Sequence, residues 1–166
     1  MVNIRKARVE DALQIAIVNV YTWKTQYSGL MPEDVIDNRV ANVEQMAMKN
    51  KQRIIDDDNY IVAEVDGTIV GFTRYAKSTY KDYENAGEIF ALYLLKGFNG
   101  KGIGRKLFEA AKDELKRAGY NKMIIKCLKG NPTLDFYKYM GGKVIGEDKM
   151  IIDNAVLEED VLMYNI

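Results

Sequence analysis

The chain has 166 residues, of which 48% are hydrophobic and 29% charged, and its 24 basic residues balance its 24 acidic residues. A chain of this length buries a substantial core, and we expect it to form a single domain over residues 1–166. The balanced charge disfavours general nucleic-acid binding, which needs a basic excess or a basic face. Histidine is absent, so histidine triads, histidine general bases and HExxH zinc sites are excluded.

Cysteine content and hydropathy indicate the cellular compartment. The single cysteine, Cys127, permits no internal disulfide, which suits a reducing environment. No apolar run approaches the roughly 20 residues that span a bilayer, and the first residues lack a signal-peptide core. We therefore expect a cytoplasmic protein with no membrane partner and no nucleic-acid partner.

The first third of the chain predicts one strand followed by helices. We expect the strand at 3–7, after which apolar residues recur at helical spacing from Val9 to Tyr21. The segment Ser28–Pro32 breaks this helix, and its proline is suited to open a second one. A longer polar helix is expected at 40–53. The acidic run Asp56–Asn59 is expected to form a solvated loop rather than a metal site.

The rest of the chain predicts further strands and helices around a hairpin. Asp66–Gly67 separates two apolar, β-branched runs, which is typical of a tight β-turn. The expected elements are strands at 60–65, 68–75 and 88–95, a helix at 103–118, a strand at 123–128, a helix at 131–140, and strands at 143–152 and 157–165. An antiparallel first half joined to a βαβα half predicts an α/β fold of the α+β mixed-sheet kind, with about seven strands and helices on both faces.

A glycine-rich turn, Asn99–Arg105, follows the apolar run Ile89–Leu95 and opens an amphipathic helix. Unpaired N–H groups and the helix dipole make such a turn an anion site. A Walker A loop is excluded because Ile103–Gly104 stand where lysine and a hydroxyl residue are needed. A dinucleotide fingerprint is excluded because Arg105 or Leu107 occupies the third glycine position.

The turn fits a third motif. Asn99-Gly100-Lys101-Gly102-Ile103-Gly104 resembles the pyrophosphate loop Q/R-x-x-G-x-G/A of the GNAT (Gcn5-related) N-acetyltransferases, with Asn99 in place of glutamine or arginine. Leu92–Leu94 matches the family's strand that pairs with the pantetheine arm. A downstream family pattern, N-x-x-A-x-x-F-Y-x-x-x-G, is matched at Asn131, Phe136, Tyr137 and Gly141. The resemblance covers essentially the whole chain.

The resemblance implies direct acetyl transfer from acetyl-CoA, the cosubstrate, to a primary amine in a ternary complex, with no metal. It implies Tyr137 as the general acid, Glu88 as a base acting through water, and the Leu94 N–H as a donor to the thioester carbonyl. A packing role for Tyr137, a helix cap for Asn131 and a strand-end role for Glu88 are the alternatives. The implied cofactor-binding residues are Leu92, Tyr93, Leu94, Asn99, Gly100, Lys101, Gly102, Ile103, Gly104, Arg105, Asn131 and Tyr137.

For the acceptor, the resemblance implies a pocket built from the first two helices and the final hairpin. Trp23, Tyr27, Glu88 and the segment Tyr80–Glu84 are its expected substrate-binding walls. The expected acceptor is a small amine such as a polyamine, and a homodimer is an assembly common in this family. The alternatives are a protein or peptide acceptor, or a non-catalytic acetyl-CoA-binding regulatory module. Four carboxylates are candidates to attract a cationic amine, and ordinary surface charge is the alternative explanation for each: Asp34, Asp37, Asp82 and Glu84.

Cys127 lies in an apolar run and is the remaining candidate nucleophile. With no histidine in the chain to activate its thiol, we expect it to be a small core residue.

Overall fold

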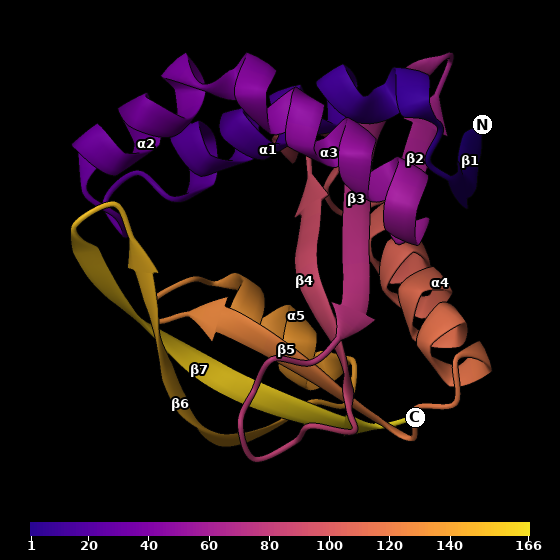
Figure 1. The fold of residues 1–166 in the computed structure, drawn as a ribbon, viewed down its shortest axis with the longest axis vertical. Coiled ribbons are helices and arrows are strands. Elements are labelled where there is room, and N and C mark those ends of the chain that lie inside the picture. Colours follow the sequence, from indigo (N-terminus) through magenta and orange to yellow (C-terminus); the bar gives the residue numbers. More distant parts are fainter.

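The computed structural model describes all 166 residues and contains one seven-stranded mixed sheet with helices on both faces (Figure 1). The strand order is β1-β2-β3-β4-β5-β7-β6. The strands are β1 (Val2–Lys6), β2 (Tyr60–Val65), β3 (Thr68–Lys77), β4 (Gly87–Leu94), β5 (Lys122–Leu128), β6 (Lys143–Ile152) and β7 (Ala155–Asn165). The predicted fold class is confirmed.

Five α-helices and two short 3-10 turns complete the chain. They are η1 (Val9–Asp11), α1 (Ala12–Gln26), α2 (Glu33–Ala41), α3 (Val43–Asp57), η2 (Lys96–Phe98), α4 (Ile103–Arg117) and α5 (Thr133–Tyr139). No helix is both long enough and apolar enough to cross a membrane.

Most predicted elements form close to their expected bounds, because their local signals are strong. The Asp66–Gly67 hairpin is confirmed: both residues have positive φ, 50° and 79°, as a two-residue turn of this kind requires. The expected loop at Asp56–Asn59 is wrong in part, because α3 continues to Asp57. Ile54 is buried on the sheet in this last turn, and the Gln52 amide donates to the Asp56 carboxylate at 2.9 Å, so packing and a side-chain pair extend the helix.

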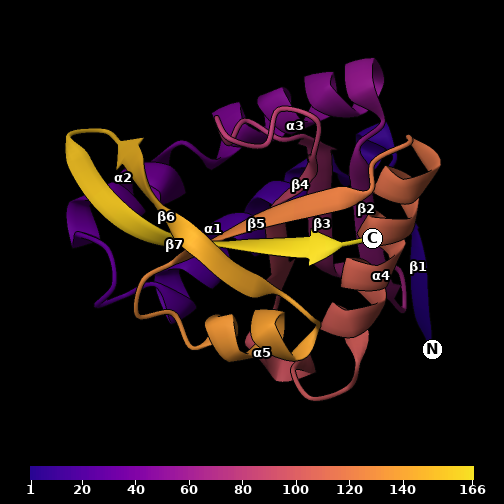
Figure 2. The same ribbon diagram turned by 90° about the horizontal axis from the view of Figure 1, so that it is seen from below.

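The two faces of the sheet carry different helices (Figure 2). Helices α4 and α5 cover one face, where Leu92 and Leu94 pack with Ile89. Helices α1 and α3 cover the other face, towards which Ala91 and Tyr93 point. On the α4 and α5 face, the residues of β4 change from an odd number, Ile89, to even numbers, Leu92 and Leu94. A β-bulge causes this change, because Arg74 of β3 pairs with Ala91 while the next residue, Tyr75, pairs with Ile89, so that Phe90 has no partner.

The centre of the sheet opens where β4 and β5 meet. These two strands are the only parallel neighbours, and they pair over three residues each, Gly87–Ile89 with Met123–Ile125. Beyond Ile89 the strands diverge, and β4 continues to Leu94 paired with β3 alone. Figure 1 shows β4 and β5 separating at this point. The remaining part of β4 therefore has one free edge inside the molecule.

Candidate active site

The free edge of β4 presents backbone groups to the gap beside β5. The Leu95 N–H donates to the Val70 carbonyl of β3 at 2.9 Å. Because successive residues of an antiparallel strand alternate in direction, the backbone groups of Leu92 and Leu94 turn away from β3 and towards the gap. The Gln26 amide contacts the Leu94 carbonyl at 3.3 Å. An extended ligand can pair with this edge as an added strand would.

The glycine-rich loop follows this edge and begins α4. Gly100 and Gly102 have φ of 75° and 76°, a conformation that residues with a side chain rarely adopt. No backbone N–H group from Gly100 to Arg105 donates to a backbone carbonyl. These donors stand together at a helix N-terminus, with the side chains of Lys101 and Arg105 exposed beside them. The loop thus has the donors and the dipole that hold a phosphate group.

A small cavity of about 90 Å³ lies where β4 and β5 separate. Five of the predicted site residues line it together, drawn from α1, β4 and the α5 region: Trp23, Tyr27, Tyr93, Asn131 and Tyr137. The indole N–H of Trp23 donates to the Tyr93 hydroxyl at 3.1 Å. Residues separated by more than one hundred positions in the chain thus meet at one point beside the free strand edge.

Tyr137 combines a packing role with a place in this small cavity. Its side chain is 7% exposed and belongs to the core under α4. The Tyr164 hydroxyl donates to its backbone carbonyl at 2.8 Å, which anchors α5 on the sheet. Burial raises the pKa of the Tyr137 phenol well above its ordinary value, so the phenol remains a proton donor at neutral and moderately alkaline pH.

Asn131 and Cys127 lie beside Tyr137 in the same cavity. The Asn131 side-chain oxygen accepts the Thr133 N–H at 3.0 Å, so the residue does cap the start of α5. Burial raises the pKa of the Cys127 thiol to about 12, which leaves little thiolate at neutral pH. The cysteine is 3% exposed among apolar side chains, in agreement with the expected core role.

Glu88 lies on the paired part of β4, opposite Ile124, and lines neither of the two cavities described here. The carboxyl group is buried and accepts a hydrogen bond from the Ser78 hydroxyl at 2.7 Å. Burial raises its pKa, although Ser78 and the nearby Lys126 and Arg74 charges oppose the rise. The predicted base therefore has a raised pKa and does not line the small cavity.

Glu159 and Lys126 also line the small cavity, and no sequence pattern identifies them as site residues. Burial raises the pKa of Glu159, and the Lys126 charge opposes this rise. The Lys126 ammonium pairs with Asp148 at 3.0 Å. In the sequence both residues resemble the ordinary polar positions of a strand. Only the pairing of Leu128 with Glu159 across β5 and β7 places this carboxyl group near Tyr137.

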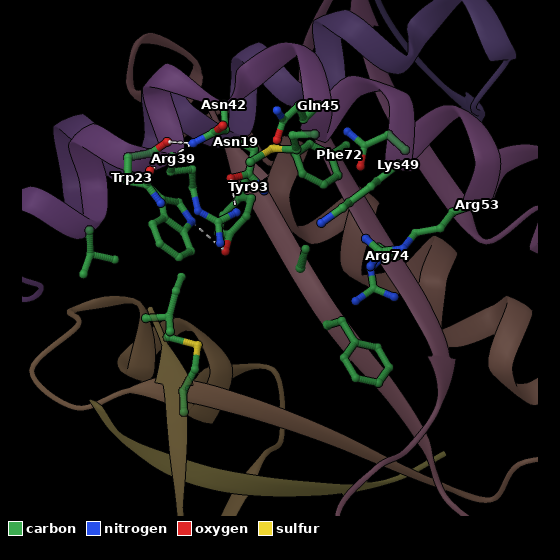
Figure 3. A pocket seen from close by; sticks show the side chains of 18 of the residues that line it. Asn19, Trp23, Arg39, Asn42, Gln45, Lys49, Arg53, Phe72, Arg74 and Tyr93 are labelled. Carbon is green, nitrogen blue, oxygen red and sulfur yellow. Dashed lines mark hydrogen bonds between the residues drawn. The ribbon is translucent and has the colours of Figure 1, made fainter. Parts of the chain in front are cut away.

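A larger cavity of about 610 Å³ opens on the α1, α2 and α3 side of β4 (Figure 3). It shares four wall residues with the small cavity: Trp23, Phe90, Tyr93 and Met150. One face of α3 forms a side of it, with Gln45, Lys49 and Arg53 at helical spacing after the N-cap residue Asn42. The two cavities are therefore adjacent, with the aromatic side chains of Trp23, Phe90 and Tyr93 between them.

Some of the residues expected to form the acceptor pocket line the two cavities, and others do not. Trp23 borders both cavities and Tyr27 borders the small one. The segment Tyr80–Glu84 borders neither; Tyr80 and Tyr83 stack on each other, with ring centroids 5.9 Å apart, and pack beside Ile124 and Val161. Asp34, Asp37, Asp82 and Glu84 also lie outside both walls.

Comparisons with known proteins identify the family of the chain. A family model described as the acetyltransferase (GNAT) family matches residues 21–141. An uncharacterised N-acetyltransferase of Bacillus subtilis, YuaI, is 29% identical over 161 residues, which cover 96% of this chain and 90% of that protein. A spermidine N(1)-acetyltransferase of Thermoplasma acidophilum is 25% identical over 152 residues, covering 89% of this chain and 91% of the relative.

Solved structures show the same fold. The PaiA N-acetyltransferase of Thermoplasma acidophilum, solved in complex with coenzyme A, has a TM-score of 0.79 at 22% identity and covers 100% of this chain and 99% of its own. The acetyltransferase yncA of Salmonella typhimurium, solved with acetyl-CoA, has a TM-score of 0.70 at 18% identity, covering 99% of this chain and 94% of its own. The chain belongs to the acetyltransferase (GNAT) family and is an acyltransferase.

Proposed function

We propose that the protein transfers an acetyl group from acetyl-CoA to a primary amine in a ternary complex. One observation carries this proposal: a phosphate-type loop, a free strand edge and a Tyr137 cavity follow one another along β4 and its continuation. A phosphate, an extended amide-bearing arm and a reacting thioester are the successive parts of acetyl-CoA. The larger cavity beyond Tyr93 supplies an entrance for the second substrate.

The donor is held mainly by backbone groups in this proposal. The unpaired N–H groups from Gly100 to Arg105 bind the pyrophosphate, and Lys101 adds positive charge. The backbone groups of Leu92 and Leu94 pair with the pantetheine amides, and the Leu94 N–H polarises the thioester carbonyl. Asn99 is an exposed residue of this loop, and because the contacts are backbone ones its shorter side chain is compatible with binding.

The chemistry then needs one attack and two proton transfers. The neutral amine nitrogen attacks the thioester carbonyl carbon, and the carbon–sulfur bond breaks as the tetrahedral intermediate collapses. The Tyr137 phenol donates its proton to the departing thiolate. A carboxylate takes the proton that the nitrogen loses, through water for Glu88 or directly at the small cavity for Glu159. Orientation of the two substrates supplies much of the remaining acceleration.

The Thermoplasma relative named for spermidine supports a polyamine as acceptor. The carboxylates expected to attract a polyamine lie outside the two cavities, and Asp153 is the one carboxylate on the wall of the larger one. The support for a polyamine acceptor therefore comes from the sequence relationship alone. A cavity of about 610 Å³ fits a small molecule, which places a peptide acceptor second.

Release of free CoA, measured with a thiol reagent against a panel of amines, tests the proposed function. Tyr137→Phe should lower kcat about 100-fold, within the range of general acid catalysis, and leave the KM for acetyl-CoA nearly unchanged. Phenylalanine preserves the packing of the ring, so a loss of folding does not explain the effect. Binding of acetyl-CoA without turnover on any amine would favour the regulatory module.

The pH profile of kcat/KM identifies the base. Both Glu88 and Glu159 have a pKa raised by burial, so activity should fall on acidification with an apparent pKa above 4.5. Protonation of the acceptor amine itself lowers the rate on acidification, so the base is recognised by an additional, steeper fall below its own pKa. Replacement of the true base by glutamine should remove this additional fall and lower the plateau, whereas replacement of the other glutamate should leave it in place. An additional fall that survives both replacements would remove both residues from the role.

A further inference from the structure

The larger cavity collects positive charge that the protein itself does not neutralise. Four basic side chains line it: Arg39, Lys49, Arg53 and Arg74. None of them forms an ion pair with a carboxylate; the nine ion pairs of the protein involve six other basic residues. Figure 3 shows these four side chains extending into the same space from α2, α3 and β3. The lone carboxylate of the wall, Asp153, stands exposed at a hairpin turn and accepts a hydrogen bond from Asn38 at 3.2 Å.

Two of the arginines flank the junction with the small cavity. The Arg39 guanidinium lies 3.5 Å from the centre of the Trp23 ring, and the Arg74 guanidinium lies 4.5 Å from the centre of the Phe90 ring. Both rings border both cavities. Stacking on an aromatic ring fixes the plane of a guanidinium and leaves its N–H edges free for a ligand. The two arginines are therefore held in place before a ligand arrives.

This arrangement is unfavourable for the protein on its own. Arg39 and Arg74 are half-buried, and burial lowers the pKa of each, with the neighbouring Arg53 charge lowering that of Arg74 further. The Asp153 carboxylate partly offsets this effect on Arg39, and Glu88, whose carboxyl group is hydrogen-bonded to Ser78, partly offsets it on Arg74. Like charges without a counter-ion cost stability, and an anion placed between them removes the cost.

We propose that the acceptor is a small primary amine that also carries an anionic group, a carboxylate or a phosphate, within a few bonds of its nitrogen. The statement rests on the proposed function and specifies its second substrate. Arg53 and Arg74 hold the anionic group, with Lys49 beside them, and the nitrogen points across Phe90 and Tyr93 towards the thioester. The Arg74 guanidinium is stacked on the Phe90 ring, which also borders the small cavity, so the anionic group would be held close to the reacting nitrogen.

The same charges assist the reaction. An ammonium ion is not a nucleophile, so the amine must lose a proton before it attacks. Nearby positive charge disfavours the ammonium form and lowers the pKa of the bound amine. The cluster thus binds the anionic group and increases the neutral fraction of the nitrogen. A polyamine meets four cations and one exposed carboxylate at this wall, which should disfavour it and separates the two acceptor classes experimentally.

Matched amine pairs test the proposal by CoA release. Alanine against alaninamide tests a carboxylate, phosphoethanolamine against ethanolamine tests a phosphate, and spermidine is the cationic arm. We expect the anionic member of one pair to have the higher kcat/KM by about tenfold or more, as charged hydrogen bonds provide. Preference for spermidine, or for acidic peptides over every small amine, would overturn the proposed acceptor while the acetyltransferase function stands.

Arg74→Gln and Arg53→Gln should remove this preference, with the KM for acetyl-CoA within about twofold of the wild type. Lys51→Gln is the matched control, since Lys51 is exposed on α3 and lines neither cavity, and it should leave the preference intact. A preference that survives both arginine replacements, or an equal rise in the KM for acetyl-CoA, would refute the assignment.

A binding measurement separates this inference from the proposed function. Trp23 is the one tryptophan of the chain and borders both cavities, so its fluorescence reports on ligands there. Titration with inorganic phosphate should change the emission of the wild type and of Lys51→Gln, but not that of Arg74→Gln. If this titration succeeds and no amine is acetylated, the anion site stands and the proposed function fails. A wild-type emission that does not respond to phosphate counts against the anion site.

Discussion

Basic side chains at the β1 edge and in the larger cavity differ in their partners. At the β1 edge, Arg5 contacts Asp11 at 2.7 Å and Glu64 at 2.6 Å, and Lys6 lies 3.2 Å from Glu114. In the cavity, Arg39 and Arg74 contact aromatic rings and no carboxylate. The four cations of the larger cavity are therefore unpaired, unlike Arg5 and Lys6 at the β1 edge and unlike Lys126, which lines the small cavity and pairs with Asp148.

The presence or absence of a carboxylate partner should decide whether a basic residue contributes mainly to stability or mainly to ligand binding. A paired arginine whose partner is buried stabilises the fold, because its removal leaves a charge without solvent or counter-ion. An unpaired arginine in a cavity contributes little to the fold and much to the binding of an anion. The two sets of residues should then respond oppositely to substitution, in stability and in substrate binding.

Arg5→Ala should have the largest effect on stability. Asp11 has a side chain 6% exposed, and removal of Arg5 leaves its carboxylate buried without its main partner. We expect a loss of about 3 kcal/mol in the free energy of unfolding, measured by urea denaturation, with kcat unchanged in the folded enzyme. Lys51→Ala, on an exposed residue without an ion pair, should change stability by less than about 0.5 kcal/mol.

The stabilisation from Asp11 should depend on pH. Its hydrogen bonds with Arg5 and the Arg8 N–H hold the pKa of this carboxyl below the ordinary value of 3.8, against the opposing effect of burial. A lowered pKa stabilises the fold above the unfolded-state pKa and loses that effect as pH falls through the folded-state pKa. The stability difference between wild type and Asp11→Asn should therefore be largest near pH 7 and shrink below pH about 4. A difference that grows on acidification would contradict this assignment.

Arg74→Gln should have the smallest effect on stability. The substitution removes a half-buried charge that repels Arg53 and also removes the stacking on Phe90. These two effects oppose each other, so we expect a change within about 0.5 kcal/mol or a slight gain. Thermal and urea unfolding measure it beside Arg5→Ala. Comparable losses in the two variants would break the distinction between the regions and make Arg74 a structural residue.

Short sequence patterns were sufficient to predict most of the helices, strands and turns. The Asp66–Gly67 turn, the apolar run of β4 and the glycine loop before α4 each depend on neighbouring residues, so their conformations follow from short stretches of sequence. The order of these elements was sufficient for the mixed sheet. The exact end of α3 was not, because the contact of Ile54 with the sheet lengthens that helix.

The site residues likewise divide into those that a local sequence pattern identifies and those that only the tertiary structure brings together. Tyr137, Asn131 and the loop residues were found because they form a spaced pattern along the chain. Glu159 and Lys126 have no such pattern, and they enter the small cavity through the pairing of β5 with β7. The expected attraction of a polyamine depends on carboxylates identified along the sequence, whereas the charged residues on the wall of the larger cavity are four basic side chains and one carboxylate.

The sequence by itself determined the elements, their order and the phosphate-type loop, since each depends on contacts within a few residues. Tertiary structure alone decided which charges meet. Arg39, Arg53 and Arg74 come from α2, α3 and β3, and only the packing of these helices over the divergence of β4 and β5 brings their guanidinium groups to one cavity. Electrostatic interactions depend on the distance between charges in space, and a net charge of zero gives no information about those distances.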